Sequence, residues 1–145
     1  MPVLTYDPRN IVVNIGGAII TGFADGTFVA VERNEDMFKK VSGADGITSR
    51  AKQNDGSWTL TMTLAQTSPS NDILSAFALK DEFSNKGVVP VLIKDIGGTT
   101  NIASAFAWVR KLPKVEYGKE ITNREWILDL ADVIMRIGGN VAATV

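Results

Sequence analysis

The sequence predicts a mainly β fold with one flanking α-helix, and the prediction rests on three features. Residues 57–65 alternate between apolar and polar side chains, which is the period of a strand with one buried face. Residues 70–83 then change to helical spacing. Short β-branched runs, separated by turns that contain Gly, occupy much of the remaining chain.

The alternating strand has one apolar face, formed by Trp58, Leu60, Met62 and Leu64. We expect Trp58 to face the core, so that Trp58→Ala costs about 3–5 kcal/mol if the ring is fully buried. The opposite face is a run of threonines, Thr59 to Thr63. Two interpretations of that face stand: an ordinary solvated sheet face, or a polar, uncharged wall against a neighbouring subunit or a channel.

The helical segment follows Pro69, and Ser70 or Asn71 is expected to cap its first turn because a short side-chain oxygen accepts from the free amides there. Asn85-Lys86-Gly87 is expected to end it. Together with the strand, the helix supplies the predicted core, whose members are Trp58, Leu60, Met62, Leu64, Leu74, Phe77 and Trp126.

The first 33 residues predict about three short antiparallel strands joined by tight turns, a β-meander. The runs are 11–15, 18–23 and 27–33, and Asp25-Gly26 is a hairpin-type turn between the last two. The triplet Ile-Gly-Gly closes apolar runs at 15–17, 96–98 and 137–139, where Gly is expected to supply a positive φ at a turn.

Residues 34–46 break the strand pattern and are predicted to form a long loop. Such a loop inside a compact domain is usually disordered or functional. It is a candidate contact with a partner, and the alternative is a loop folded onto its own core. The candidate contact residues are Asn34, Glu35, Asp36, Met37, Phe38, Lys39, Lys40 and Val41.

The remaining segments are mostly strands. Residues 47–53 form a polar strand, and residues 99–109 form a largely apolar one. Residues 88–94 contain Pro90, which cannot donate to a ladder, so this strand is expected at an edge or a bulge. Residues 124–137 stay open, because their apolar positions fit a helical face well and also fit a bulged strand buried on both sides.

The composition excludes several classes of functional site. The chain has 145 residues, typical of a single domain, 1–145. It has no Cys and no His, which excludes disulfides, Cys/His zinc sites and imidazole chemistry. Neither a dinucleotide-binding nor a phosphate-binding Gly motif occurs, and no carboxylate pair stands out. We therefore expect no enzyme, no cofactor and no metal.

The charge and hydropathy patterns add two expectations. The net charge is −1, and the only basic clusters are Lys39-Lys40 and Arg110-Lys111, so a tight grip on a nucleic-acid duplex is not expected. No apolar run is long enough to span a bilayer, and the first ten residues lack the features of a secretion signal. We expect no membrane anchor and a protein that is made and kept, at least at first, in a cytoplasm.

The order of segments resembles the tail tube (inner tube) proteins of contractile-tailed bacteriophages and R-type tailocins. The resemblance is carried by a co-linear set that spans nearly the whole chain. Its members are Tyr6-Asp7-Pro8, Gly22-Phe23-Ala24-Asp25-Gly26, Val31-Glu32-Arg33-Asn34-Glu35-Asp36 with Phe38, Gly43-Ala44-Asp45-Gly46 with Arg50, the stretch from Leu64 to Ser75, and Gly138-Gly139-Asn140.

The resemblance implies a β-sandwich or partial barrel with one flanking helix, and it implies a long strand at 124–137. It also implies a structural virion protein of the tail, in which six subunits join their sheets into a ring and rings stack into a tube. The implied partners are other copies, the sheath, baseplate and terminator proteins, and a tape measure protein in the lumen. DNA would pass through without specific binding. Residues 34–46 are then the candidate contact between stacked rings.

Two other functions compete with the tube. A tail-completion or baseplate protein of the same fold would cap the tube at a single ring. A small enzyme with a β-barrel core is opposed by the missing His and Cys. A tube protein polymerises, a cap stops at one ring, and an enzyme need do neither.

Overall fold

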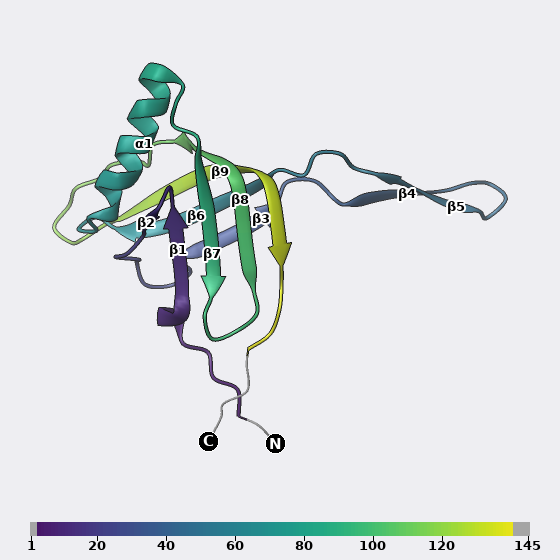
Figure 1. Ribbon diagram of the computed structural model, residues 1–145, viewed down its shortest axis with the longest axis horizontal. Coiled ribbons are helices and arrows are strands. Elements are labelled where there is room, and N and C mark those ends of the chain that lie inside the picture. The colour runs from purple at the N-terminus through teal and green to yellow at the C-terminus, as the bar shows by residue number, and fades with distance from the viewer. Residues whose placement is uncertain (1–2, 141–145) are drawn as a thin grey trace.

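The computed structural model describes residues 3–140, which form nine strands, one α-helix and a short 3-10 helix, Pro8–Asn10. Figure 1 shows a curled sheet with the helix across one end and a thin two-stranded extension on one side. The bounds are β1 Ile11–Ile15, β2 Ala18–Ile19, β3 Val29–Arg33, β4 Phe38–Ser42, β5 Thr48–Lys52, β6 Trp58–Ala65, α1 Ser70–Ser84, β7 Val89–Asp95, β8 Asn101–Lys111 and β9 Asn123–Arg136.

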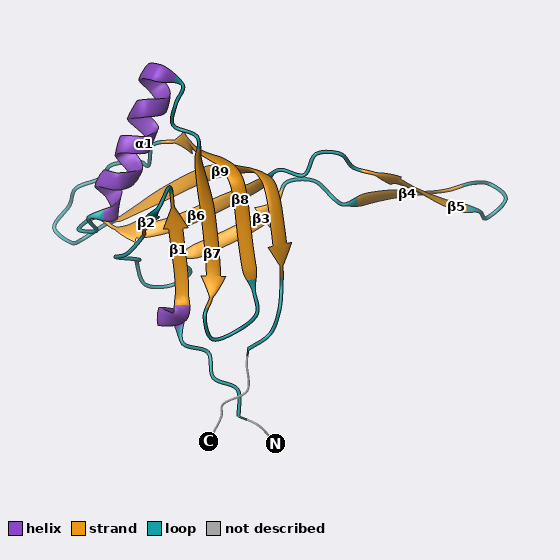
Figure 2. Cartoon of the chain, viewed as in Figure 1, coloured by secondary structure: helices purple, strands orange, loops and turns teal. Residues whose placement is uncertain are grey.

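Seven strands form one sheet in the order β2-β1-β7-β8-β9-β6-β3, and every pair in it is antiparallel. The sheet curls so that its inner face encloses the core, but β2 and β3 are not paired with each other within the described chain. The fold is therefore a partial barrel, mainly β with one helix, as predicted (Figure 2).

The predicted core residues line the inside of this curl. Leu60, Met62, Leu64, Leu74 and Trp126 are buried, whereas Trp58 and Phe77 are partly buried and pack against them. Strand β6 alternates as its sequence requires, with the threonines on the opposite, half-exposed face. Sequence reasoning missed the contributions of β1 and β7, which add Val13, Ile15, Val91 and Ile93.

The predicted β-meander at the N-terminus is wrong. Strand β2 pairs with β1, but β3 pairs with β6 at the opposite edge of the sheet. Residues 20–28 make the crossing and tie the two edges together. The Ile20 amide donates to the Val13 carbonyl, and Phe23 forms a bridge with Leu64. The turn at Asp25-Gly26 therefore joins no hairpin.

Gly22, in this crossing segment, has a φ of +76°, and a Cβ there would lie 2.6 Å from the Ser68 Cβ. Ser68 is buried, and its hydroxyl donates to the Thr21 carbonyl. We expect Gly22→Ala to lower the free energy of unfolding by about 1–3 kcal/mol, because both the backbone and the contact are strained. Urea denaturation measures this. Gly26→Ala is the matched control, since Gly26 has a φ of +87° with open space around it. Equal losses for the two variants would show that the Ser68 contact contributes nothing.

Helix α1 begins at Ser70, but neither Ser70 nor Asn71 caps it. Pro69 occupies the cap position without a side-chain hydrogen bond, and the Ser68 hydroxyl accepts from the Ser70 amide instead. The Asn71 amide group serves tertiary structure: its Oδ1 accepts from the Trp126 indole at 2.9 Å, and its Nδ2 donates to the Ala65 carbonyl. The helix ends as predicted at Asn85, which is left-handed with a φ of 58°.

Residues 124–137, left open by periodicity, form the long strand β9, which the resemblance implied. Trp126, Leu128 and Leu130 point inward, and then Asp132, with a φ of 50°, shifts the alternation by one residue. Val133 and Met135 pack inward beyond Asp132, whereas Ile134 is 78% exposed. The shift adds a residue between buried positions and so imitates helical spacing.

Strand β8 changes its alternation at the same place. Its register with β9 is unshifted from Ser104–Val133 to Phe106–Ala131, with Ala105 and Asp132 unpaired between them, and the register shift lies farther along, between Val109 and Lys111. The buried Ser104 hydroxyl contacts the Phe106 and Ala131 carbonyls there. Both strands bend in this region, which helps the sheet to curl (Figure 2).

Pro90 lies at a bulge and not at an edge. Strand β7 runs between β1 and β8, and its register with β8 shifts between Val89 and Val91. The Pro90 carbonyl still accepts from the Gly16 amide at 2.8 Å. Of the three Ile-Gly-Gly triplets, only the first has glycines with positive φ, at Gly16 and Gly17.

Candidate functional site

The most distinctive surface is a β-hairpin that projects from the sheet, and it corrects the predicted long loop at 34–46. Strands β4 and β5 pair only with each other, and they stand clear of the rest of the chain (Figure 1). We call residues 34–57 the arm. At its base the Asn34 amide donates to the Ser57 carbonyl, and the Gln53 amide donates to the Met37 carbonyl. At its tip Gly46 turns with a φ of +85°.

Strand β5 lies within the polar strand predicted at 47–53, but β4 was predicted as loop, because it lacks an apolar face. All residues of β4 and β5 are exposed, so no alternation of buried and exposed positions marks them. The predicted contact residues now divide between two parts of the arm: 34–37 form its base, while 38–41 lie in β4. Three apolar side chains, Met37, Phe38 and Val41, are exposed there.

The cross-strand register gives the arm two different faces. Phe38, Lys40 and Ser42 stand opposite Lys52, Arg50 and Thr48 on one face. On the other, Lys39 and Val41 stand opposite Ala51 and Ser49. The Arg50 guanidinium lies 4.1 Å from the centre of the Phe38 ring, a cation–π contact that orders the first face.

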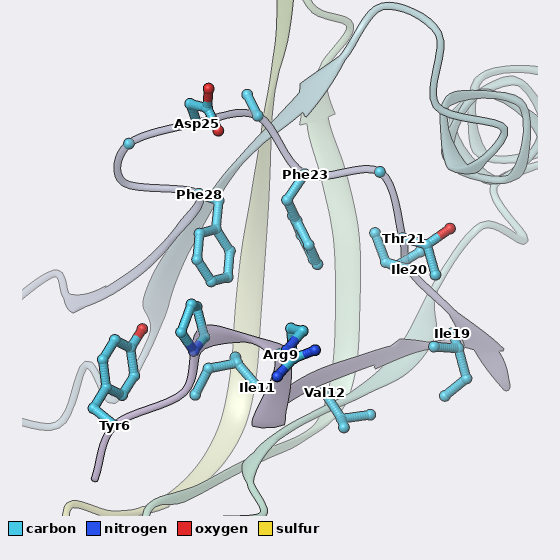
Figure 3. A pocket seen from close by; sticks show the side chains of 14 residues that line it. Tyr6, Arg9, Ile11, Val12, Ile19, Ile20, Thr21, Phe23, Asp25 and Phe28 are labelled. Atoms are coloured by element: carbon cyan, nitrogen blue, oxygen red, sulfur yellow. The ribbon is translucent and has the colours of Figure 1, made fainter.

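A groove of about 790 Å³ opens between the N-terminal segment, β1–β2 and residues 20–28. Figure 3 shows that aromatic and aliphatic side chains, among them Tyr6, Ile19, Phe23 and Phe28, surround it. Its ionised groups are Arg9 and Asp25. Arg9 forms an ion pair with Asp7, and its side-chain hydrogen bond lowers the pKa of the Asp7 carboxyl. The lining is mostly apolar, as in a surface that packs against another apolar surface. It offers no pair of groups for acid–base chemistry.

A charged pair, Arg110 on β8 and Asp129 on β9, lies beside the threonine face of β6. Arg110 donates to Asp129 through Nε at 2.9 Å, and its Nη2 donates to the Thr59 hydroxyl. The side-chain hydrogen bond with Asp129 raises the pKa of Arg110, which stays charged. The part of the outer face at β6 is therefore polar, and Arg110 and Asp129 balance each other on it.

Two further exposed surfaces are apolar. On α1, Leu79 and Phe83 are spaced four residues apart, and Phe83 is 81% exposed. On the outer face of the sheet, the register aligns Leu92, Ala103 and Ile134 in one row across β7, β8 and β9. In total 20 large apolar side chains of the described residues are exposed.

The structure offers little for catalysis or metal binding. Within residues 3–140, no cluster of three or more acidic, His or Cys residues is placed to hold a metal ion. In the same part of the chain, no helix combines the length and hydropathy that a membrane crossing needs. The shifted pKa values belong to exposed groups such as Asp55, whose pKa is lowered mainly by its hydrogen bond with Ser57.

Arg124 is a buried cation that the sequence analysis did not single out. Arg124 is 6% exposed and donates to the Thr122 hydroxyl and to the Glu116 carbonyl, while its guanidinium lies over the Tyr117 ring. These contacts fix residues 116–122, the segment before β9, to the start of that strand. A single Arg carries no sequence signal of such a role.

Comparisons with known proteins give a consistent result. The family described as "Bacteriophage PhiTE tail tube protein" matches residues 10–138. A curated relative, structural protein ORF10 of Pseudomonas phage KPP10, is 31% identical over 144 residues, covering 94% of this chain and 83% of the relative.

Solved structures share the fold at low sequence identity. The sheath/tube terminator of the extracellular contractile injection system PVC, in its extended state, has a TM-score of 0.61 at 15% identity, covering 93% of this chain and 99% of its own. The tube-terminating cap of the anti-feeding prophage has a TM-score of 0.63 at 11% identity, covering 92% and 93%. The PVC sheath–tube complex has a TM-score of 0.61 at 15% identity, covering 91% of each chain.

The structural neighbours establish the fold alone. The family match, by contrast, covers most of the chain, and the relative's description as a structural protein agrees with it. The expectation that the protein is not an enzyme is confirmed by this membership. This chain belongs to the bacteriophage PhiTE tail tube protein family, and it is a structural component of a phage-type tail.

Proposed function

We propose that the protein assembles into hexameric rings that stack as the inner tube of a contractile tail, the conduit for DNA ejection. The observation that carries this proposal is the arm, a two-stranded hairpin with every strand residue exposed. An isolated two-stranded hairpin is marginally stable in water. A partner that covers the arm would stabilise it, and another copy of the chain is the partner that a tube requires.

The open edges of the sheet support ring formation. Strands β2 and β3 end the seven-stranded sheet, and exposed edges tend to pair with other chains. The β2 edge of one copy and the β3 edge of the next form a heterologous contact, which closes into a ring when its rotation divides the circle evenly. Joining sheets in this way leaves the polar face with Thr59, Thr61 and Thr63 to line a channel.

The threonine-rich part of the outer face suits passage of DNA without specific binding. There Arg110 is balanced by Asp129, so this part offers no row of cations to hold phosphates. In this assembly the remaining partners are the tail sheath, the baseplate and terminator proteins, and a tape measure protein in the lumen. The likeness in fold to a chain from a sheath–tube complex supports this setting.

A cap that terminates the tube is the second candidate. It is favoured by the likeness to a sheath/tube terminator and to a tube-terminating cap, each over at least 92% of this chain. The two functions differ in the number of rings that assemble: a tube stacks many rings, whereas a cap stops at one.

Sedimentation velocity over a concentration series tests the proposal. The tube function predicts a broad distribution of large, hollow-particle sizes that grows with protein concentration. A single sharp species of ring size at every concentration would favour the cap. A monomer throughout would contradict both functions.

A further inference from the structure

The first face of the arm gathers positive charge without a compensating acid. The register places Lys40 directly opposite Arg50, with Lys52 next along β5. Like charges directly opposite each other destabilise a strand pair. Neither strand contains Asp or Glu, and among the described residues the ion pairs all lie elsewhere, at Arg9–Asp7, Arg110–Asp129 and Lys114–Glu116.

The base of the same arm gathers negative charge. Glu35, Asp36 and Asp55 are all exposed there. Arg33 lies beside them, but it donates to the backbone carbonyls of Glu35 and Asp55. The Ser57 amide donates to the Asp55 carboxylate at 3.0 Å, which favours its ionised form. The base is therefore an acidic surface held in shape by Arg33.

The cations of one arm lie at different distances from its acidic base. Lys52 pairs with Phe38, two residues beyond Asp36, so it lies close to the base. Lys40 lies four residues beyond Asp36, and Arg50 stands directly opposite it. The Lys40–Arg50 pair therefore lies farther out along the arm than the acids of the base, an arrangement suited to contact between copies.

We propose that the cationic face of one arm docks against the acidic arm base of a second copy, in the next ring of the stack. The inference rests on the proposed tube function and names the surface that receives the arm. Because the donor and acceptor surfaces differ, the contact is heterologous and repeats from ring to ring. Each arm that docks leaves its own base free to receive the next.

Salt dependence follows from this geometry. Exposed charges are screened strongly as the Debye length falls from about 10 Å at 0.1 M salt to roughly 3 Å at 1 M. We expect the protein concentration needed for stacking to rise about tenfold or more over that range, because several exposed ion pairs weaken together.

Two charge-reversal variants test the contact directly. In the first, Lys40→Glu and Arg50→Glu make the arm face acidic. In the second, Glu35→Lys and Asp36→Lys make the base basic. We expect each variant alone to form rings that do not stack, and an equal mixture of the two to recover tubes, because each reversed surface then meets its complement. Electron microscopy and pelleting measure stacking.

The control is Lys80→Glu with Lys86→Glu, at exposed positions on and beside α1. It makes the same change in net charge as the first variant. This control should assemble like the wild type. The arm packs on no core, so circular dichroism and thermal unfolding of the reversed variants should match those of the wild type.

The outcomes separate the inference from the function on which it rests. If both reversed variants form tubes as the wild type does, the docking contact is overturned while the tube function stands. If they fail to stack and the mixture also fails, the acidic base is not the receiving surface. If the wild type itself never assembles, the tube function fails and the docking contact fails with it.

Discussion

A variant in which residues 35–56 are replaced by Asn-Gly is expected to fold normally and to lose tube formation completely. Asn34 and Ser57 are already joined by a backbone hydrogen bond, so a two-residue turn can connect β3 to β6 at that point. The deleted residues contribute nothing to the buried core. Pelleting and electron microscopy would show the loss of tubes, and circular dichroism would show the retained fold.

The matched control for this replacement is Ser49→Ala, which leaves the arm and its charges in place. It should form tubes of normal length. Tubes of normal length from the variant that lacks the arm would exclude the arm from ring-to-ring contact. An unfolded variant would instead show that the arm stabilises the protomer.

Trp126→Ala is expected to cause the largest loss of stability from a single substitution, about 3–5 kcal/mol. The Trp126 side chain is 1% exposed at the centre of the core, and its indole donates to Asn71 in the first turn of α1. Truncation removes the ring and also leaves the Asn71 oxygen without that donor. A loss of this size is a large fraction of the 5–15 kcal/mol typical of a domain.

The measurement is urea denaturation in the background that lacks the arm, since assembly would otherwise add to the apparent stability. Trp58→Ala serves as the comparison. Trp58 is only partly buried, so its truncation should cost less, about 1–3 kcal/mol. If Trp58→Ala proved as costly as Trp126→Ala, the indole burial and its bond to Asn71 would not be the source of the loss.

The part of the fold that sequence could predict is local and strongly patterned. Strand β6 and helix α1 follow each other in the chain, and each has one clearly buried face. The helix extends one residue beyond its predicted end, to Ser84. In both elements the pattern of apolar residues agrees with the tertiary structure, and the helix ends at Asn85 as predicted, although its predicted N-terminal cap does not form.

The rest depended on information that periodicity does not carry. The choice between strand and helix at β9 turned on the irregularity at Asp132, where the alternation of buried and exposed residues changes partway along the strand. The partner of β3 is β6, about 30 residues later, although β2 lies nearer in the chain. Such long-range pairing is decided by closure of the whole core.

The arm was missed for a related reason. Strand β5 falls within the polar strand predicted at 47–53, but β4 has no buried face and was predicted as loop, so its pairing with β5 was not expected. The charges of the arm were visible in the sequence, but only the register shows that Lys40 faces Arg50. The candidate contact at 34–41 therefore remains a prediction, now divided between an acidic base and a cationic strand.

Negative-stain electron microscopy of the purified wild-type protein over a concentration series is the most direct measurement. The proposed function predicts hollow tubes of constant diameter, built from stacked rings with six-fold symmetry in end-on views, and lengthening as the concentration rises. Single rings that never stack would contradict a tube and favour a terminating cap. Particles no larger than a monomer at every concentration would contradict self-assembly itself.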